Sequence, residues 1–269
     1  DGTDTMLDLL QPKGILQHRH NAFSKTKLKP QHAALQATET EPLIAGADWA
    51  ICMDVDEFIN IKVGDGRLPA LFAAMEAAMP GANMIALTWR LFGNGGVVGY
   101  DDQPVTESFT RAAPPVLHWP WRALLFKTLV KNDGSYGKLG VHRPRAPVTE
   151  RMAGQRWFDG SGRVLPKTFH QKRIFSDVGR DHHALVQLNH YPLGAMESFL
   201  VKADRGRGVH AGDALGVGYW VERNFAVEED RSILTLDTRS GREALLADPI
   251  LGPLHRDAVA WRQARFRQL

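Results

Sequence analysis

The sequence predicts an α/β protein with a mostly parallel central sheet flanked by helices, followed by an antiparallel or loop-rich extension and by C-terminal helices. Three observations support this prediction. Short apolar runs alternate with helical patterns through the first hundred residues, Gly and Pro then become frequent, and helical periodicity returns from Gly194. Alternating strands and helices are typical of a parallel sheet with helices packed on its faces.

The alternating pattern occupies residues 1–92. A helical stretch is recognised by apolar residues at spacings of three and four, and a buried strand by a short apolar run between turn signals. Pro80 and Gly81 end the third helical pattern. The predicted helices are residues 1–11, 30–43 and 68–79, and the predicted strands are residues 15–18, 49–55 and 84–91.

The remainder divides into residues 93–193 and 194–269, and the whole chain is expected to form a single domain. Residues 93–193 are loop-rich, with a strand predicted at 124–131 and a mobile surface loop predicted at 152–167, where glycines cluster. Residues 194–269 return to helical spacing. The middle segment is therefore expected to be an extension that shapes a substrate site.

Composition limits the class of protein. The chain has 269 residues, 33 Lys plus Arg against 30 Asp plus Glu, and 43% hydrophobic residues, which suits a globular protein rather than a disordered one. The basic residues are dispersed, so nucleic acid is not an expected partner. The single Cys52, in an apolar stretch, is expected to be a buried hydrophobe in a reducing compartment. No membrane span or signal peptide is recognised, which predicts a cytoplasmic location, with the inner-membrane surface as an alternative.

The strongest chemical signal is the pair Asp54 and Asp56. They end an apolar run, and the period of two along a strand predicts that both carboxylates face one side while Val55 points to the core. Two close anions favour a divalent cation, Mn²⁺ or Mg²⁺, held by oxygen ligands. A short Asp-x-Asp motif is also common in solvated turns, which is the alternative interpretation.

Several further segments, taken together and in order along the chain, resemble segments of a known family. With Asp54-Val-Asp-Glu-Phe58, the sequence resembles bacterial family-2-like glycosyltransferases of the GT-A type. The matching segments, which span nearly the whole chain, are Asp1-Gly-Thr-Asp4, Trp89-Arg-Leu-Phe-Gly93, Thr106-Glu-Ser-Phe109, Lys127-Thr128, Gly140-Val-His-Arg-Pro144, Asn189-His-Tyr191 and Glu229-Asp-Arg-Ser232.

The resemblance implies that a sugar is transferred from a nucleotide-diphosphate donor, with UDP-sugars favoured, to a hydroxyl of a carbohydrate or glycoconjugate during polysaccharide synthesis. It implies a divalent metal at Asp54 and Asp56, and residues 1–92 as the nucleotide- and metal-binding part. Relatives of this type usually begin with a strand, a helix and another strand, which are absent here. A missing strand would expose a sheet edge, so self-association or a partner chain is expected at the N-terminal edge.

Transfer to a hydroxyl needs a carboxylate that accepts the proton of the acceptor. Glu107 is the first candidate because it follows the glycine-rich turn and lies away from the predicted metal pair. Asp101 and Asp102 are the alternatives, and ordinary solvated surface acids are the remaining interpretation.

Two histidines, His142 and His190, follow apolar stretches and are expected at strand ends that face the same cleft. A neutral imidazole there can complete a metal shell or donate to a diphosphate. A satisfied structural histidine is the alternative for each. The other histidines weighed, namely His18, His20, His182 and His183, are expected at the surface.

Basic residues are candidates for binding the donor. Lys202 and Arg205 either form a basic flap over a leaving nucleoside diphosphate or compensate the C-terminal end of a helix. Lys127, Arg143 and Asp4 are further candidates for binding the nucleotide. Two aromatic residues, Trp119 and Trp121, are expected to pack, with a platform for an acceptor sugar as the alternative.

Two other functions are compatible with the motif. One is a metal-dependent phosphohydrolase with Asp54 as nucleophile, although Phe58 stands where such enzymes usually have Thr or Val. The other is a noncatalytic module that binds a nucleotide or a glycan. The sequence contains none of four other motifs: a dinucleotide-binding loop, a P-loop, a Gly-x-Ser-x-Gly elbow or a structural zinc site.

Overall fold

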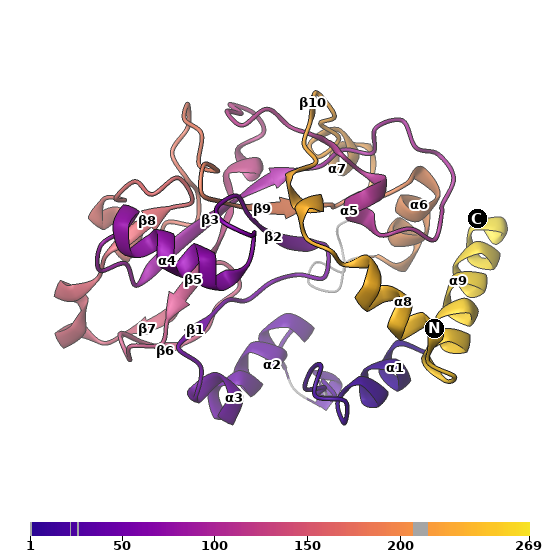
Figure 1. Ribbon diagram of the computed structural model, residues 1–269, viewed down its shortest axis with the longest axis horizontal. Helices are drawn as coiled ribbons and strands as arrows, with labels where there is room; N and C mark the ends of the chain where they lie inside the picture. Colours follow the sequence, from indigo (N-terminus) through magenta and orange to yellow (C-terminus); the bar gives the residue numbers. More distant parts are fainter. Residues whose placement is uncertain (1, 22, 26, 207–214) are drawn as a thin grey trace.

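The structure is a computed structural model that describes residues 2–21, 23–25, 27–206 and 215–269. Its main element is the six-stranded sheet near the centre of Figure 1, in which five strands lie in the order β1-β5-β3-β9-β2. The sixth strand, β8, pairs with the start of β3, whereas β9 pairs with its end. The strands are β1 Trp49–Ala50, β2 Glu57–Ile61, β3 Met84–Leu91, β5 Phe126–Lys131, β8 Trp157–Asp159 and β9 Val186–His190.

The protein is mixed α/β as predicted, but its sheet is largely antiparallel, so the prediction of a mostly parallel sheet is wrong. Of the five strand pairs described in this sheet, β1–β5, β3–β5 and β2–β9 are antiparallel, and β3–β8 and β3–β9 are parallel. A parallel neighbour requires a crossover, usually a helix. The chain between β3 and β5 holds a four-residue helix, a two-residue strand and a short 3₁₀ turn, and β5 returns antiparallel.

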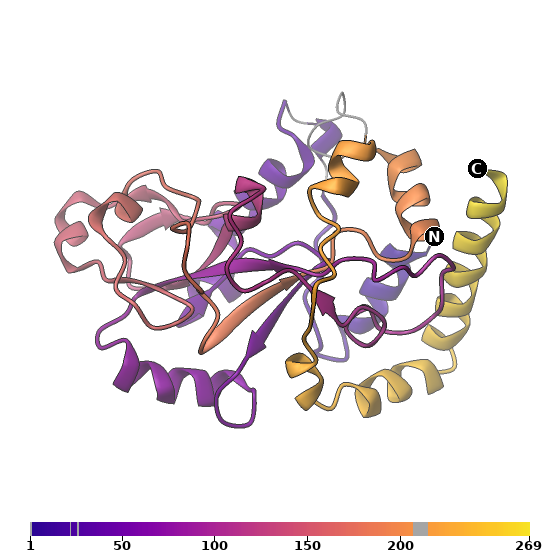
Figure 2. The ribbon, with the colours of Figure 1, turned by 90° about the horizontal axis from the view of Figure 1, so that it is seen from above.

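Each face of the sheet supports its own core. On one face, Leu71 and Met75 of α4 (Leu68–Ala78) pack with Ile85 and Leu87 of β3. Figure 2 shows α4 along this side of the sheet. The alternate residues of β3 pack on the opposite face against a cluster that contains Trp157. Because side chains along a strand alternate between faces, one apolar run serves both cores.

The helices lie on both sides of the sheet and at one end of the molecule. Helix α9 contacts α1, α6 and α8, and both ends of the chain lie on the same side of Figure 1. No helix in the described part of the chain is long and apolar enough to cross a membrane. The α-helices are α1 Thr3–Leu10, α2 Pro30–Ala37, α3 Pro42–Ala45, α4 Leu68–Ala78, α5 Val105–Ser108, α6 Met196–Arg205, α7 Val217–Val221, α8 Arg239–Ala247 and α9 Leu251–Gln268.

Shorter elements complete the fold. Two small antiparallel sheets lie outside the main one, and 3₁₀ turns join several strands. The small sheets pair β4 Arg111–Ala112 with β10 Glu228–Glu229, and β6 Tyr136–Lys138 with β7 Arg145–Pro147. The 3₁₀ turns are η1 Phe23–Lys25, η2 Thr38–Thr40, η3 Trp121–Leu124, η4 Thr149–Gly154, η5 Lys167–His170 and η6 Ser232–Thr235.

The predictions for individual segments hold best where periodicity is strong. The strand at 84–91 and the helix at 68–79 are confirmed within a residue, and the helix predicted at 30–43 is interrupted by η2. Residues 15–18, which are described, form no strand, and the strand predicted at 49–55 ends at Ala50. The predicted surface loop at 152–167 instead contains β8 and the fully buried Trp157, because its glycines separate apolar residues that belong to the core.

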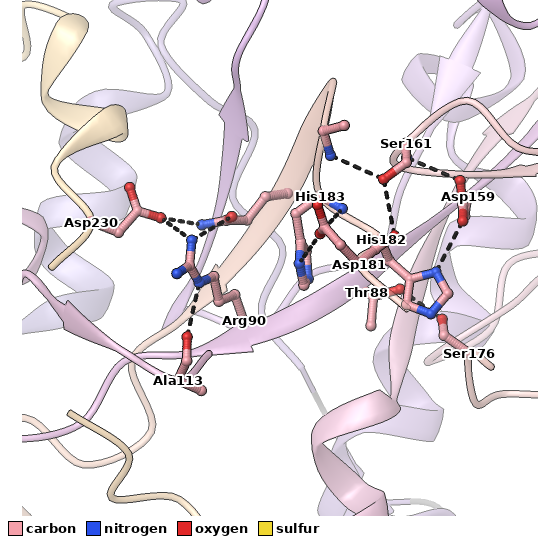
Figure 3. Close-up of polar contacts among 12 residues, drawn as sticks. Thr88, Arg90, Ala113, Asp159, Ser161, Ser176, Asp181, His182, His183 and Asp230 are labelled. Carbon is pink, nitrogen blue, oxygen red and sulfur yellow. Dashed lines mark hydrogen bonds and ion pairs between the residues drawn. The ribbon is translucent and has the colours of Figure 1, made fainter. Parts of the chain in front are cut away.

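Buried polar groups lie on the face of the sheet opposite α4, because Thr88 and Arg90 alternate with Leu87 and Trp89 along β3. Figure 3 shows their contacts. Arg90 of β3 donates to Asp230 at 2.8 Å, and both side chains are 7% exposed. The expectation that His182 and His183 lie at the surface is wrong, since they are 1% and 4% exposed. Each is held by an acid, because Asp159 contacts Nδ1 of His182 and Asp181 contacts Nδ1 of His183, both at 3.0 Å. These acids stabilise the buried rings.

Candidate functional site

Four polar or aromatic side chains form a row on the α4 face of the sheet, beyond the apolar core. They come from four neighbouring strands: Lys127 from β5, Trp89 from β3, His190 from β9 and Glu57 from β2. Strand alternation places them on the same face as Ile85, Leu87, Leu129 and Leu188 of the α4 core. The sheet therefore brings together residues that are up to 133 positions apart in the chain, from Glu57 to His190.

The Asp54 and Asp56 carboxylates lie in a turn just before β2. The Glu57 backbone N–H donates to the Asp54 carbonyl at 3.1 Å, and the Asp54 N–H donates to the Glu57 carboxylate at 2.9 Å. The prediction that Val55 points into the core is wrong, because this side chain is 99% exposed. The strand period does not apply in a turn, so the two Asp side chains diverge toward different partners.

The Asp54 carboxylate is bound to Lys127, which is fully buried. The Lys127 Nζ lies 2.9 Å from Asp54 and 3.6 Å from Glu57, so one ammonium bridges two carboxylates. Trp89 Nε1 donates to the other oxygen of Glu57 at 2.7 Å. Burial raises the pKa of Glu57 to about 7, against the opposing effect of Lys127. A buried ammonium group such as that of Lys127 is stable only when carboxylates are paired with it.

The Asp56 carboxylate is bound to a different lysine. Lys202 of α6 donates to Asp56 at 3.0 Å and to the Pro192 carbonyl at 2.7 Å. Nε2 of His190 lies 3.7 Å from the second oxygen of Asp56. Burial alone would raise the pKa of Asp56, but His190 and Lys202 outweigh it and hold the pKa below its ordinary value.

The ring of His190 is buried and uncharged at neutral pH. Burial lowers the pKa of His190 to about 4. The ring lies 4.2 Å from the Trp89 ring, and its Nδ1 is buried without a hydrogen-bond partner. The second predicted histidine, His142, lies 5.9 Å from Trp89, and its Nδ1 is 3.0 Å from the Phe126 carbonyl. Of the two histidines, only His190 has a described contact with the carboxylate pair, and His142 lies in a bend rather than at a strand end.

The donor set fits a divalent cation that also binds a phosphate. The side chains of Asp54 and Asp56 are 42% and 26% exposed, and each gives one oxygen to a lysine. The other oxygen accepts from Gln31 in Asp54 and lies 3.7 Å from His190 in Asp56. In the described parts of the chain, no three His, Cys, Asp or Glu side chains group so as to hold a metal by themselves. Mg²⁺ is commonly bound through one or two carboxylates, with water and substrate phosphates as the other ligands. Asp54 and Asp56 fit that mode, with His190 beside them.

The two predicted catalytic acids lie elsewhere. Glu107 is on α5, and α5 packs against η6, where Ser232 accepts from Asn60. Asn60 is three positions after Glu57 on β2, so this contact is on the opposite face of the sheet. Asp102 contacts Nε2 of His255 at 2.9 Å, in α9. Neither acid has a described contact with Asp54 or Asp56.

Among the predicted nucleotide-binding residues, only Lys127 and Lys202 contact the carboxylate pair in the described contacts. The Arg143 guanidinium donates to the Phe169 and His170 carbonyls and is buried. Asp4 and Arg205 are both exposed, Asp4 on α1 and Arg205 at the end of α6.

Trp119 and Trp121, which were expected to pack, are both exposed. Trp119 is 56% exposed and Trp121 is 53% exposed. Trp121 contacts Phe175 edge-on at 4.6 Å, and Arg122 lies over the Trp121 ring at 4.8 Å. Each indole therefore keeps about half of its surface open to solvent.

Sequence reasoning missed Glu57, Trp89 and Gln31. Glu57 and Trp89 were part of the matched segments, but no role was assigned to them. A buried acid needs a partner, but the sequence alone does not show that Glu57 is buried. Gln31 donates to Asp54 at 3.1 Å from α2, a contact that sequence spacing does not reveal.

No protein-family model matches the chain, and no curated protein is significantly similar to it.

Proposed function

We propose that the protein transfers a glycosyl group from a nucleotide-diphosphate sugar to a hydroxyl of a carbohydrate or glycoconjugate, in polysaccharide or glycoconjugate synthesis. The observation that supports this most is the partly exposed pair of Asp54 and Asp56, each bound to one lysine. Such a site suits a ligand that carries both a cation and a diphosphate. The resemblance of the matched segments to GT-A glycosyltransferases agrees with this chemistry.

The side chains have separate parts in the proposed reaction. A bound Mn²⁺ or Mg²⁺ would neutralise negative charge on the leaving diphosphate, and a carboxylate base would accept the proton of the acceptor hydroxyl. Lys127 orients Asp54, Glu57 lies beside the Lys127 ammonium, and Trp89 orients Glu57 by donating to it. Lys202 orients Asp56 and adds positive charge at the mouth of the site. These fixed charges are organised before the ligand arrives, as effective electrostatic stabilisation requires.

A panel of nucleotide sugars tests the proposal. The protein is incubated with each sugar, Mn²⁺ and an acceptor mixture, and the released nucleoside diphosphate and the transferred sugar are both measured. Glycosyl transfer gives both products in equal amounts. Release of inorganic phosphate instead would indicate a phosphohydrolase, and nucleotide binding without any product would indicate a binding module. Either of these results rejects the proposed reaction.

The variant Glu107→Gln tests the base that the sequence suggests. Loss of a general base lowers turnover by about 10²- to 10⁴-fold. Because α5 and the Glu57 carboxylate lie on opposite faces of the sheet, we expect turnover of Glu107→Gln to stay close to that of the wild type. Steady-state rates under saturating donor make the comparison. A fall in turnover within the range given above would show that Glu107 is the base and that α5 reaches the donor site when the substrates are bound.

A further inference from the structure

Positive charge is concentrated in one stretch of the chain, residues 136–174, which we call the basic end. It carries nine Lys and Arg residues against two Asp and Glu residues, whereas the whole chain carries 33 against 30. The rest of the protein therefore has an excess of negative charge. Figures 1 and 2 show this stretch, drawn in pink and salmon, at the end of the molecule opposite the C-terminus. Such a charge asymmetry indicates an anionic partner.

The fold gathers the cations of the basic end, although they form no continuous tract in the sequence. Pairing of β6 with β7 places Lys138 opposite Arg145. The Arg143 guanidinium donates to the Phe169 and His170 carbonyls, which joins this hairpin to η5. Residues from three separate segments consequently add their charge to the same end of the molecule.

Most cations of the basic end have no acidic partner. Three of the nine form ion pairs, which are Lys138–Glu39, Arg163–Asp159 and Arg173–Asp177. The other six have no ion pair in the described part of the chain, and all but the first of them are exposed: Arg143, Arg145, Arg151, Arg156, Lys167 and Lys172. Their positive charge therefore remains available to a partner.

A surface hollow lies between residues 141–147 and 171–174, with a volume of about 370 Å³. Three of the cations line it, namely Arg143, Arg145 and Lys172, and none of the described residues that line it is acidic. Apolar surface is contributed by Val141, Pro147 and Ile174. A group that joins negative charge to an aliphatic part matches both components of this lining.

These features favour a phospholipid surface over a nucleic acid. Single-stranded nucleic acid stacks on exposed aromatic side chains, and no Trp, Tyr or Phe of the basic end is exposed. The basic end also contains no α-helix that could enter the groove of a duplex. In contrast, Val164 is 72% exposed and offers aliphatic contact at a membrane surface.

We infer that the basic end docks on a membrane surface rich in anionic phospholipid, with lipid headgroups at Arg145 and Lys172. Anionic lipids attract basic residues that lie close to the surface, and salt screens this attraction. His142 also lines the hollow, and its ring lies 5.9 Å from the Trp89 ring, so docking would hold the candidate site close to the membrane. The inference goes beyond the proposed glycosyl transfer and does not depend on it.

Co-sedimentation with lipid vesicles tests this inference. Vesicles of equal parts phosphatidylcholine and phosphatidylglycerol should bind the wild type, whereas vesicles of phosphatidylcholine alone should not. A basic residue near an anionic surface contributes about fivefold in affinity, so the double variant Arg145→Glu with Lys172→Glu should bind at least about 25-fold more weakly. Binding of the wild type should also weaken as the salt concentration rises.

The matched control is Arg256→Glu with Arg267→Glu, which makes the same change of charge at two exposed positions on α9 and should keep the affinity for the vesicles. Circular dichroism establishes folding. If the double variant at the hollow does not fold, Lys167→Glu, at another exposed cation of the basic end, replaces it and should bind at least about fivefold more weakly.

Equal losses of affinity in the hollow and control variants would show that the inference is wrong. The same conclusion follows if the wild type does not bind the anionic vesicles or binds both kinds of vesicle equally. If single-stranded RNA at equal phosphate concentration removes the wild type from the vesicles, the basic end is a nucleic-acid surface and the inference also fails. Glycosyl transfer to a soluble acceptor is measured separately, so failure of the proposed function is distinguishable from failure of the docking surface.

Discussion

Asp54→Asn and Asp56→Asn should each abolish Mn²⁺-dependent binding of a nucleoside diphosphate while leaving the protein folded. The amide keeps the shape of the side chain but removes the charge that attracts a hard cation. Groups that only orient a metal ligand already contribute about 10- to 100-fold in affinity, so loss of a ligand should weaken binding by about 100-fold or more. Calorimetry with UDP and Mn²⁺ measures the effect for each variant.

The fold should survive these substitutions because both side chains are partly exposed, 42% for Asp54 and 26% for Asp56. Asp54→Asn also leaves the Lys127 ammonium with Glu57 as its charged partner at 3.6 Å. Asp65→Asn is the control, since its side chain is 64% exposed and it carries the same chemical change. Equal affinity in the wild type and both site variants would remove the metal assignment from this pair.

The largest expected loss of stability follows Arg90→Met. Arg90 lies on the face of the sheet opposite α4. It donates to Asp230 and to the Ala113 carbonyl, as Figure 3 shows, and also to Glu228. Removing one partner of a buried ion pair leaves an uncompensated charge and costs about 3–5 kcal/mol. Asp230 is 7% exposed and would be that charge. Urea denaturation gives the free energy of unfolding of each variant.

The comparison for Arg90→Met is Arg122→Met, which breaks one ion pair, with Glu222 at 3.0 Å, and removes the guanidinium over the Trp121 ring. The Arg122 side chain is 46% exposed, and exposed pairs contribute about 0–1 kcal/mol. The double variant Arg90→Met with Asp230→Asn removes both charges of the buried pair and should recover part of the loss. Similar losses in the free energy of unfolding for Arg90→Met and Arg122→Met would show that the buried ion pair contributes no more to stability than the exposed one.

The prediction of sheet direction failed for a reason that can be stated physically. Apolar runs such as that of β3 identify buried strands, but a run has no direction, and direction was inferred from the alternation with helices. In residues 93–193 the connections are long and irregular, and they supply β5, β8 and β9 to the same sheet as β2 and β3. Pairing between segments distant in sequence depends on packing, which local patterns do not encode.

In the candidate site too, some residues could be recognised from the sequence and others only from the structure. Asp54 and Asp56 stand out in the sequence because close acids after an apolar run need compensation, and His142 and His190 stand out because each follows an apolar stretch. Lys127 was one basic residue among several, and only its burial against Asp54 distinguishes it from Arg143. The turn that exposes Val55 also depends on a contact between backbone and side chain, at Asp54 and Glu57.

The sequence by itself determined the mixed α/β class, the position of β3 and α4, and the acidic pair as the centre of interest, because periodicity and charge are local properties. Only the tertiary structure decided which cations meet those acids and which candidates do not. Lys127 and Lys202 come from β5 and α6, and Glu107 from the other face of the sheet. The order of the strands and the alternation of side chains along them determine these contacts, because they fix which side chains lie on the same face of the sheet.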